Sequence, residues 1–363
     1  MQKKLIALAI ASAFSASAFA ESTVNVYGLV DGAIVSPTAT GYKSSVIAAS
    51  NGLSGSRLGV KAVEDLDNGM KAVAVLEYAL DVETNQQTAT TTAASGMVAR
   101  QQMLALAGDF GTVATGYLQT TGYDFGAKYD VVAGSAVSPL SNITGGEGFL
   151  IGINAAGKRA QRALAYISPK VGGVTVAVNY STAFDSASTL GNNGVASSGT
   201  STNVTATLLS ANYEEGPLAA GVVYAATNKT PATGNASEMA LGVSYNLGVA
   251  TVKATYQNQT TNAATSLKNS AMSVGATVPV ATGIVAVSYA KSTMDSNSTN
   301  KDASGYTVAF LQPMSKTTTA YAAYSAMNQS TGGTGVSVLN NVWGTAFAAD
   351  KSSVIALGLN KKF

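Results

Sequence analysis

The chain has 363 residues, of which only 11% are charged, and its 21 basic residues nearly balance its 19 acidic ones. No long run of Lys or Arg is present, so the sequence argues against a nucleic-acid-binding protein. Histidine and cysteine are both absent, which excludes Ser-His or Asp-His hydrolysis, a His/Cys metal centre and disulfides, and we therefore expect neither an enzyme nor a cofactor.

The first twenty residues have the features of a cleavable export signal. Lys3 and Lys4 precede an apolar run from Leu5 to Ile10, and Ala18-Phe19-Ala20 forms an Ala-x-Ala cleavage site. The alternative, a membrane anchor, needs a longer apolar helix. We expect cleavage after Ala20, which removes two lysines and no acid and leaves the charges balanced. The mature chain, residues 21–363, is then expected to form a single domain.

After Ala20, the sequence alternates between apolar and small or polar residues in segments separated by Gly, Asn, Asp and Ser. No uncharged apolar stretch is long enough for a spanning helix, so the remaining way to cross a membrane is with strands. The first half predicts strands at 23–35, 55–63, 70–80, 97–107, 112–118, 160–168, 174–182 and 202–214. The second half predicts strands at 218–227, 236–246, 249–259, 270–280, 284–292, 304–314, 317–328 and 352–363.

Tight turns and longer polar loops alternate between these strands. The tight turns fall at 65–69, 108–111, 169–173, 215–217, 247–248, 281–283 and 315–316, and most carry Gly, Asn, Asp or Pro. This rhythm is typical of outer-membrane barrels with short periplasmic turns and long external loops. An even number of strands lets the first and last strands pair and leaves no unpaired edge in lipid. We therefore predict an all-β, sixteen-stranded antiparallel transmembrane barrel.

The alternation also predicts what each face of the wall contacts. In the strand at 70–80, Leu76 and Tyr78 share the apolar face, whereas Lys71 and Glu77 lie on the other. The last strand has Ile355, Leu357, Leu359 and Phe363 on one face and small or polar residues, including Asn360, on the opposite face. Charged groups on the inner face imply a water-filled lumen, because a packed interior would leave them without enough partners.

In addition to this pattern, the mature chain resembles the general diffusion porins of Gram-negative outer membranes, in particular the neisserial and betaproteobacterial branch. The resemblance is specific as an ordered set and weak for any one member. The first matching segments are Val24-Asn25-Val26-Tyr27-Gly28, Gly55-Ser56-Arg57-Leu58-Gly59-Val60-Lys61, Glu64-Asp65-Leu66, Gly69-Met70-Lys71-Ala72-Val73 and Leu76-Glu77-Tyr78. The later ones are Arg100-Gln101, Gly108-Asp109-Phe110-Gly111-Thr112-Val113, Ala165-Tyr166-Ile167-Ser168-Pro169 and Phe363.

The resemblance implies a homotrimer in the outer membrane, in contact with lipid and lipopolysaccharide, that passes small hydrophilic solutes. It also implies that the third external loop, residues 119–158, folds inward, and that Phe363 belongs to the signal read by the barrel assembly machinery. The loop is long enough to enter a barrel. It departs from the family where a Pro-Glu-Phe-Gly type segment is usual, because Ser138-Pro139-Leu140-Ser141 and Gly145-Gly146-Glu147-Gly148 stand there.

In such porins, basic side chains on the wall face acidic groups on the inward loop at the narrowest point. By resemblance, Arg57, Arg100 and Arg159 match the wall positions. The candidate pore-constriction residues are then Arg57, Lys61, Lys71, Arg100 and Arg159 on the wall and Asp124, Asp130 and Glu147 in the loop. Lys61 shares the face of Arg57, and Lys71 continues the basic stripe. The cluster is reduced, because Leu29 replaces a basic residue found in some relatives.

The sequence leaves two questions open. Opposed charges across the lumen would order water and sort ions, but the same arginines would also serve simply to pair with loop acids and hold the loop in place. The leading function is passive diffusion through a general pore; a substrate-specific channel, a barrel enzyme such as a phospholipase or protease, and a β-rich adhesin are the alternatives. Ion preference and the physiological solute are not predicted.

Overall fold

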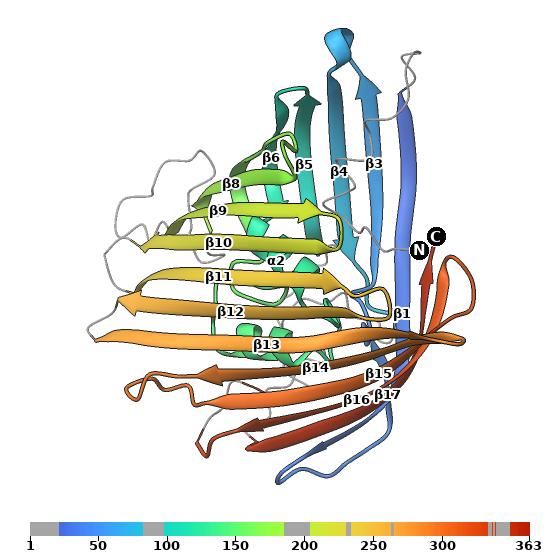
Figure 1. Cartoon of the computed structure of the whole chain (residues 1–363), viewed down its shortest axis with the longest axis vertical. Coiled ribbons are helices and arrows are strands. Elements are labelled where there is room, and N and C mark those ends of the chain that lie inside the picture. Colours follow the sequence, from blue (N-terminus) through green and yellow to red (C-terminus); the bar gives the residue numbers. More distant parts are fainter. Residues whose placement is uncertain are drawn as a thin grey trace.

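In the computed structural model, the described residues are 22–82, 98–184, 204–229, 234–262, 265–332, 336, 338 and 349–363. The predicted export signal at residues 1–20 lies outside this set, as do the first residues of the strands predicted at 97–107 and 202–214. Figure 1 shows the described part as one strongly curved sheet that surrounds two short helices.

Within the described residues there are seventeen strands, two α-helices and one 3-10 helix. The first nine strands are β1 (Thr23–Ala39), β2 (Ile47–Ser50), β3 (Arg57–Asp65), β4 (Lys71–Ala79), β5 (Ala99–Gly108), β6 (Gly111–Gln119), β7 (Arg159–Ile167), β8 (Val174–Ala183) and β9 (Val204–Glu215). The other eight are β10 (Leu218–Lys229), β11 (Asn235–Asn246), β12 (Thr251–Asn262), β13 (Ser266–Val280), β14 (Gly283–Thr293), β15 (Ala303–Pro313), β16 (Thr318–Gln329) and β17 (Lys351–Lys362). The helices are η1 (Asp67–Gly69), α2 (Thr121–Tyr129) and α3 (Pro139–Gly146).

The sheet closes on itself through β1. Its first half pairs with β3, from Thr23 opposite Val63 to Leu29 opposite Arg57, and its second half pairs with β17, from Leu29 opposite Lys362 to Ala39 opposite Ser352. All other spanning strands pair antiparallel with their neighbours in sequence. Sixteen strands therefore form a closed antiparallel barrel, and the short β2 adds a four-residue pairing to β1.

The predicted fold class is confirmed. Each of the sixteen predicted strands overlaps one wall strand, and their ends differ by no more than four residues. The turns follow the expected chemistry. Between β3 and β4, for example, Asn68 and Gly69 both have positive φ, at 60° and 73°, a conformation that Asn and Gly adopt with little strain. The sequence did not predict β2, α2 or α3.

The two faces of the wall differ as the alternation predicts. Leu357 is 56% exposed and Leu76 is 47% exposed on the outer face, where hydrocarbon replaces water. Their inward neighbours Asn360 and Glu77 are 5% and 8% exposed. Among the described residues, no helix has the length and hydrophobicity needed to cross a membrane.

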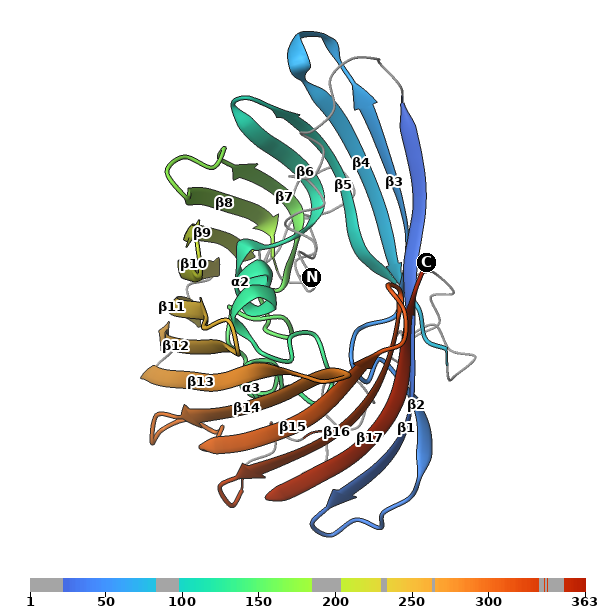
Figure 2. The same ribbon diagram turned by 45° about the vertical axis from the view of Figure 1, so that its right-hand side comes forward.

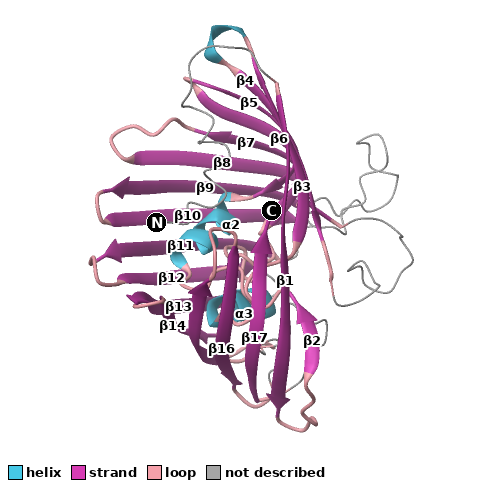
Figure 3. Cartoon of the chain, turned by 90° about the vertical axis from the view of Figure 1, so that its right-hand side faces the viewer, coloured by secondary structure: helices cyan, strands magenta, loops and turns pink. Residues whose placement is uncertain are grey.

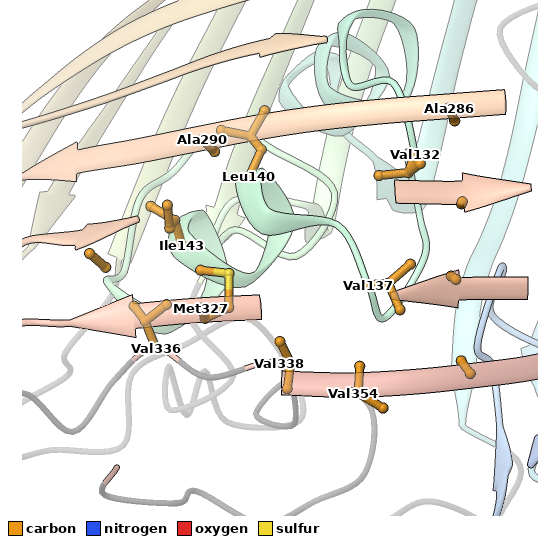
Figure 4. Close-up of a cluster of buried hydrophobic side chains, with 14 of the residues drawn as sticks. Val132, Val137, Leu140, Ile143, Ala286, Ala290, Met327, Val336, Val338 and Val354 are labelled. Atoms are coloured by element: carbon orange, nitrogen blue, oxygen red, sulfur yellow. The ribbon is translucent and has the colours of Figure 1, made fainter. Parts of the chain in front are cut away.

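The segment between β6 and β7 lies inside the barrel. Helix α2 packs against β8 to β12 and α3 packs against β13 to β16, and Figures 2 and 3 show both helices within the curve of the sheet. Small inward residues of the wall, such as Ala286 and Ala290, leave room for Leu140 and Ile143 of α3, and Figure 4 shows the resulting apolar cluster. The inward loop therefore covers one side of the lumen and leaves β3 to β7 facing it from the other.

Candidate functional site

Two arginines converge on one carboxylate on the uncovered wall. The Nε atom of Arg100 in β5 donates a hydrogen bond of 2.8 Å to Oε1 of Glu77 in β4, and Nε of Arg57 in β3 lies 3.8 Å from Oε2. The Tyr27 hydroxyl in β1 also donates to Oε2, at 3.1 Å. The Glu77 carboxylate thus contacts three neighbouring side chains. Its single negative charge lies between the positive charges of Arg57 and Arg100.

A β-bulge explains why Arg100 reaches this cluster. By simple alternation, Arg100 would share the lipid-facing side with Leu104, which is 59% exposed. The register between β4 and β5 shifts here: Glu77 pairs with Gln101, but Tyr78 pairs with Ala99. Arg100 is the extra residue in β5, and a bulge of this kind re-aims a side chain. The guanidinium of Arg100 therefore points inward, although strict alternation along β5 would turn it outward.

The third arginine contacts the inward loop. The guanidinium carbon of Arg159, the first residue of β7, lies 5.1 Å from the centre of the Tyr123 ring in α2, a cation–π distance. The Tyr123 side chain is also hydrogen-bonded to Arg100. One aromatic residue of the loop therefore touches two of the three predicted wall arginines, and it defines where the loop and the basic wall face each other.

Of the three predicted loop acids, Asp130 and Glu147 are turned toward the loop itself and the opposite wall. Asp130 is 2% exposed and accepts hydrogen bonds from the hydroxyls of Ser138, at 2.5 Å, and Ser141, at 3.2 Å, at the start of α3. Burial raises the pKa of Asp130 despite these bonds. Glu147 is 4% exposed and accepts from the Ser292 hydroxyl of β14 at 2.8 Å. Neither carboxylate forms a described ion pair with the arginines, so both serve chiefly to hold the loop.

Asp124, the third loop acid, sits in the first turn of α2. Its Oδ1 atom accepts a hydrogen bond of 2.7 Å from Gln119 at the end of β6. Burial raises the pKa of Asp124 to about 6, and the Gln119 bond opposes this shift. Asp124 lies five residues after Gln119, the last residue of β6.

The loop is fixed to the wall by a set of buried polar side chains. Glu238 of β11 is 1% exposed and accepts from the backbone N–H groups of Leu150, at 2.5 Å, and Ile151, at 3.3 Å. Lys253 of β12 donates to the carbonyl oxygens of Lys128, at 2.6 Å, and Asp130, at 3.0 Å, at the end of α2. These contacts satisfy backbone groups that would otherwise be buried without partners.

Comparison with known proteins identifies the family. The family model described as Gram-negative porin matches residues 7–332. A relative from Delftia acidovorans, "Outer membrane porin protein 32", is 30% identical over 333 residues, which cover 88% of each chain. The chain belongs to the Gram-negative porin family.

Solved structures agree with the porin fold. The anion-selective porin from Comamonas acidovorans is 24% identical, covers 94% of this chain and 100% of its own, and superposes with a TM-score of 0.76. The trimer form of OmpT from Vibrio cholerae is 16% identical, covers 94% and 99%, and has a TM-score of 0.64. This porin is therefore a channel of the Gram-negative outer membrane through which solutes diffuse passively.

The two predicted lysines lie on the short-turn side of the porin's arginine cluster. Lys61 is four residues beyond Arg57 in β3, about 13 Å along the strand. Lys71 forms an ion pair with Asp65 across the β3–β4 turn. Arg57, Arg100 and Arg159 are thus brought together, whereas Lys61 and Lys71 are separate from them.

Among the described residues, no group of three or more His, Cys, Asp or Glu could hold a metal ion.

Sequence reasoning missed three residues that organise the porin's lumen. Glu77 is predicted on the inner face but without a link to the arginines, although its neighbouring strands carry them. Tyr123 has no signal in the sequence beyond its place in the inward loop. Glu238 lies about 90 residues from the loop that it binds. The feature of the sequence that indicates its role is an acidic residue on the inward face of an otherwise uncharged strand.

Proposed function

We propose that this porin is exported by its first twenty residues and works as a pore whose narrowest part lies between Arg57, Arg100 and Arg159 and the inward loop. The contact of Tyr123 with both Arg100 and Arg159 is the observation that carries this assignment, because it brings the loop and the basic wall together. Residues 119–158 are then the constriction loop, and residues 21–363 form the mature single domain.

We further infer that the pore prefers anions. One wall carboxylate, Glu77, is shared by Arg57 and Arg100. Arg159 and the adjacent Lys158 add two positive charges that form no ion pair among the described residues. The loop acids Asp130 and Glu147 are buried elsewhere and do not cancel this positive charge. Fixed charges in a narrow lumen attract ions of the opposite sign. The relative from Comamonas acidovorans, which is described as anion-selective, supports the same preference.

Reversal potentials in a KCl gradient across a planar bilayer test the assignment. The wild-type porin should give the sign of an anion-preferring channel, and the variant Arg57→Gln, Arg100→Gln, Arg159→Gln should shift toward cations. The matched control Arg162→Gln, Lys170→Gln, Lys316→Gln removes the same charge from exposed positions and should leave the potential unchanged. Equal selectivity of the wild type and the arginine variant would refute the constriction.

We also propose that the porin assembles as a homotrimer and contacts lipopolysaccharide and the barrel assembly machinery. The trimer form of OmpT from Vibrio cholerae, which shares the fold, supports the first part. Single-channel recordings should then show conductance steps in groups of three, and N-terminal sequencing of the membrane-extracted protein should begin at Glu21.

An enzyme is disfavoured because the whole chain lacks His and Cys. An adhesin without a barrel would not show heat-modifiable migration in detergent gels.

A further inference from the structure

A cavity of about 400 Å³ lies on the external, long-loop side of the arginine cluster. Its walls come from the end of β6, the start of β7, the last part of the inward loop, and the long-loop ends of β8 to β12. Its size falls within the range of roughly 300–1,000 Å³ typical of sites for small organic ligands. A solute that enters from outside would meet this cavity, which Arg159 lines, before it reaches Arg57 and Arg100.

One side of the cavity is positively charged. Lys158 and Arg159 both line it, and none of the described lining residues is acidic. Burial lowers the pKa of Lys158 to about 8, and the charges of Arg159 and Arg100 add to this effect. The Nε–H of Arg159 is buried without a hydrogen-bond partner among the described residues. A carboxylate placed here would relieve the repulsion between these cations and supply acceptors to the guanidinium.

The other side of the cavity is apolar. Phe184, which follows β8, lines it together with Leu150 and Val204, and these three side chains are 9%, 6% and 4% exposed. They belong to a larger packed cluster with wall residues such as Leu208, so neighbouring side chains support the apolar side. A flat hydrocarbon group set against it would bury apolar surface that a hydrated inorganic ion cannot offer.

We propose that this cavity is a binding subsite for small carboxylates with a flat apolar body, of which benzoate is the simplest probe. The carboxylate would bind Lys158 and Arg159, and the ring would pack on Phe184. This inference rests on the proposed function of the pore and deepens it, because the subsite would concentrate such anions in front of the constriction. Gln161 and Gln259, which also line the cavity, would supply further hydrogen bonds at its edge.

Current block in planar bilayers tests the subsite. Sodium benzoate should reduce the single-channel KCl current in a saturable manner, and at lower concentration from the long-loop side than from the short-turn side. Acetate, which keeps the carboxylate, and benzyl alcohol, which keeps the ring, should block much less. The Phe184→Ala variant should weaken benzoate block roughly tenfold through lost apolar contact and leave the KCl reversal potential unchanged. Phe110→Ala, at an exposed turn on the opposite side, should behave as the wild type.

The outcomes separate this inference from the function on which it rests. An ohmic, anion-preferring channel on which benzoate acts no more strongly than acetate would overturn the subsite and leave the pore intact. Absence of channels would overturn the proposed function itself. If Phe184→Ala does not assemble, Lys158→Met serves as the second variant. Benzoate block unaffected by whichever variant assembles would also overturn the subsite.

Discussion

At the scale of single residues, Glu147 shows how burial changes the protonation of a carboxyl group in this porin. One of its oxygens accepts the Ser292 hydroxyl, and the other, Oε2, is buried without a partner among the described residues. Burial raises the pKa of Glu147 to about 8; the Ser292 bond opposes this shift, and the nearby Asp302 charge adds to it. The carboxyl is therefore largely protonated at neutral pH, where a charged form would be costly.

This raised pKa predicts that the inward loop loosens in alkali. A group whose pKa is higher in the folded than in the unfolded chain stabilises the fold fully below the unfolded value and loses that stabilisation as pH rises through the folded value. For Glu147, the window runs from about 4.5 to about 8. The loss is on the order of a few kcal/mol, since one pKa unit corresponds to about 1.4 kcal/mol.

The Glu147→Gln variant should therefore lose less thermal stability than the wild type as pH rises from 5 to 9. The amide remains neutral and can still accept from Ser292. Heat-modifiable migration in detergent at each pH measures the unfolding temperature. Glu64→Gln, at an exposed position near the β3–β4 turn, is the control and should follow the wild type. A Glu147→Gln variant with the same pH slope as the wild type would contradict the argument.

At the scale of elements, α2 can approach the barrel wall because the wall residues beneath it are small. Gly221 and Gly242 lie under Tyr129, and a Cβ atom built on Gly242 would be 2.5 Å from Cγ of that ring. The Tyr129 hydroxyl donates to Oδ1 of Asn212 in β9 at 3.3 Å. Helix position is thus set by two glycines on neighbouring strands and by one hydrogen bond.

Substitution Gly242→Ala should push α2 into the lumen and lower the single-channel conductance. Overpacking of this kind costs about 1–3 kcal/mol, so a lower unfolding temperature should accompany the change. The double variant Gly242→Ala, Tyr129→Leu removes the ring that the new methyl group meets and should recover most of the conductance. Unchanged conductance of the single variant would show that α2 is not held by this contact.

At the scale of the whole molecule, the last residue contributes to barrel closure. The backbone N–H of Gly28 in β1 donates to the Phe363 carbonyl at 3.0 Å, and the Phe363 N–H donates to the Gly28 carbonyl at 3.1 Å. The Phe363 ring lies against Gly28, where an added Cβ would collide with Cζ of the ring. The residue that resembles the family's assembly signal thus also completes the seam between the first and last strands.

Deletion of Phe363 should lower the amount of folded porin in the outer membrane and leave the conductance of the channels that do form unchanged. Two seam hydrogen bonds are lost, whereas every side chain of the proposed constriction is retained. Immunoblots of membrane fractions, with heat-modifiable migration as the measure of folding, test the yield. The control Phe110→Ala removes an aromatic residue from a turn and should assemble normally. Wild-type membrane levels after the deletion would argue against the role of Phe363.

For the inward loop, the sequence predicted the path of the chain but not the contacts of its side chains. Its length, and the resemblance to porins, predicted that residues 119–158 enter the barrel, and they do. The roles of its acids were not predictable, because Asp130 bonds the start of α3 and Glu147 bonds a strand about 145 residues away. Arg100 is the opposite case: alternation alone would have turned it toward lipid, and only the resemblance assigned it to the pore.

The sequence by itself determined the wall of this porin. Whether a strand residue faces lipid or lumen depends on its parity, and parity is a local property that the alternation and the turns record directly. Only the tertiary structure decided which side chains meet inside, such as Tyr123 with Arg100 and Arg159, or Glu238 with Leu150 and Ile151. Those contacts join residues far apart in the chain. They exist only once the barrel has closed around its own loop and a bulge has turned the Arg100 side chain inward.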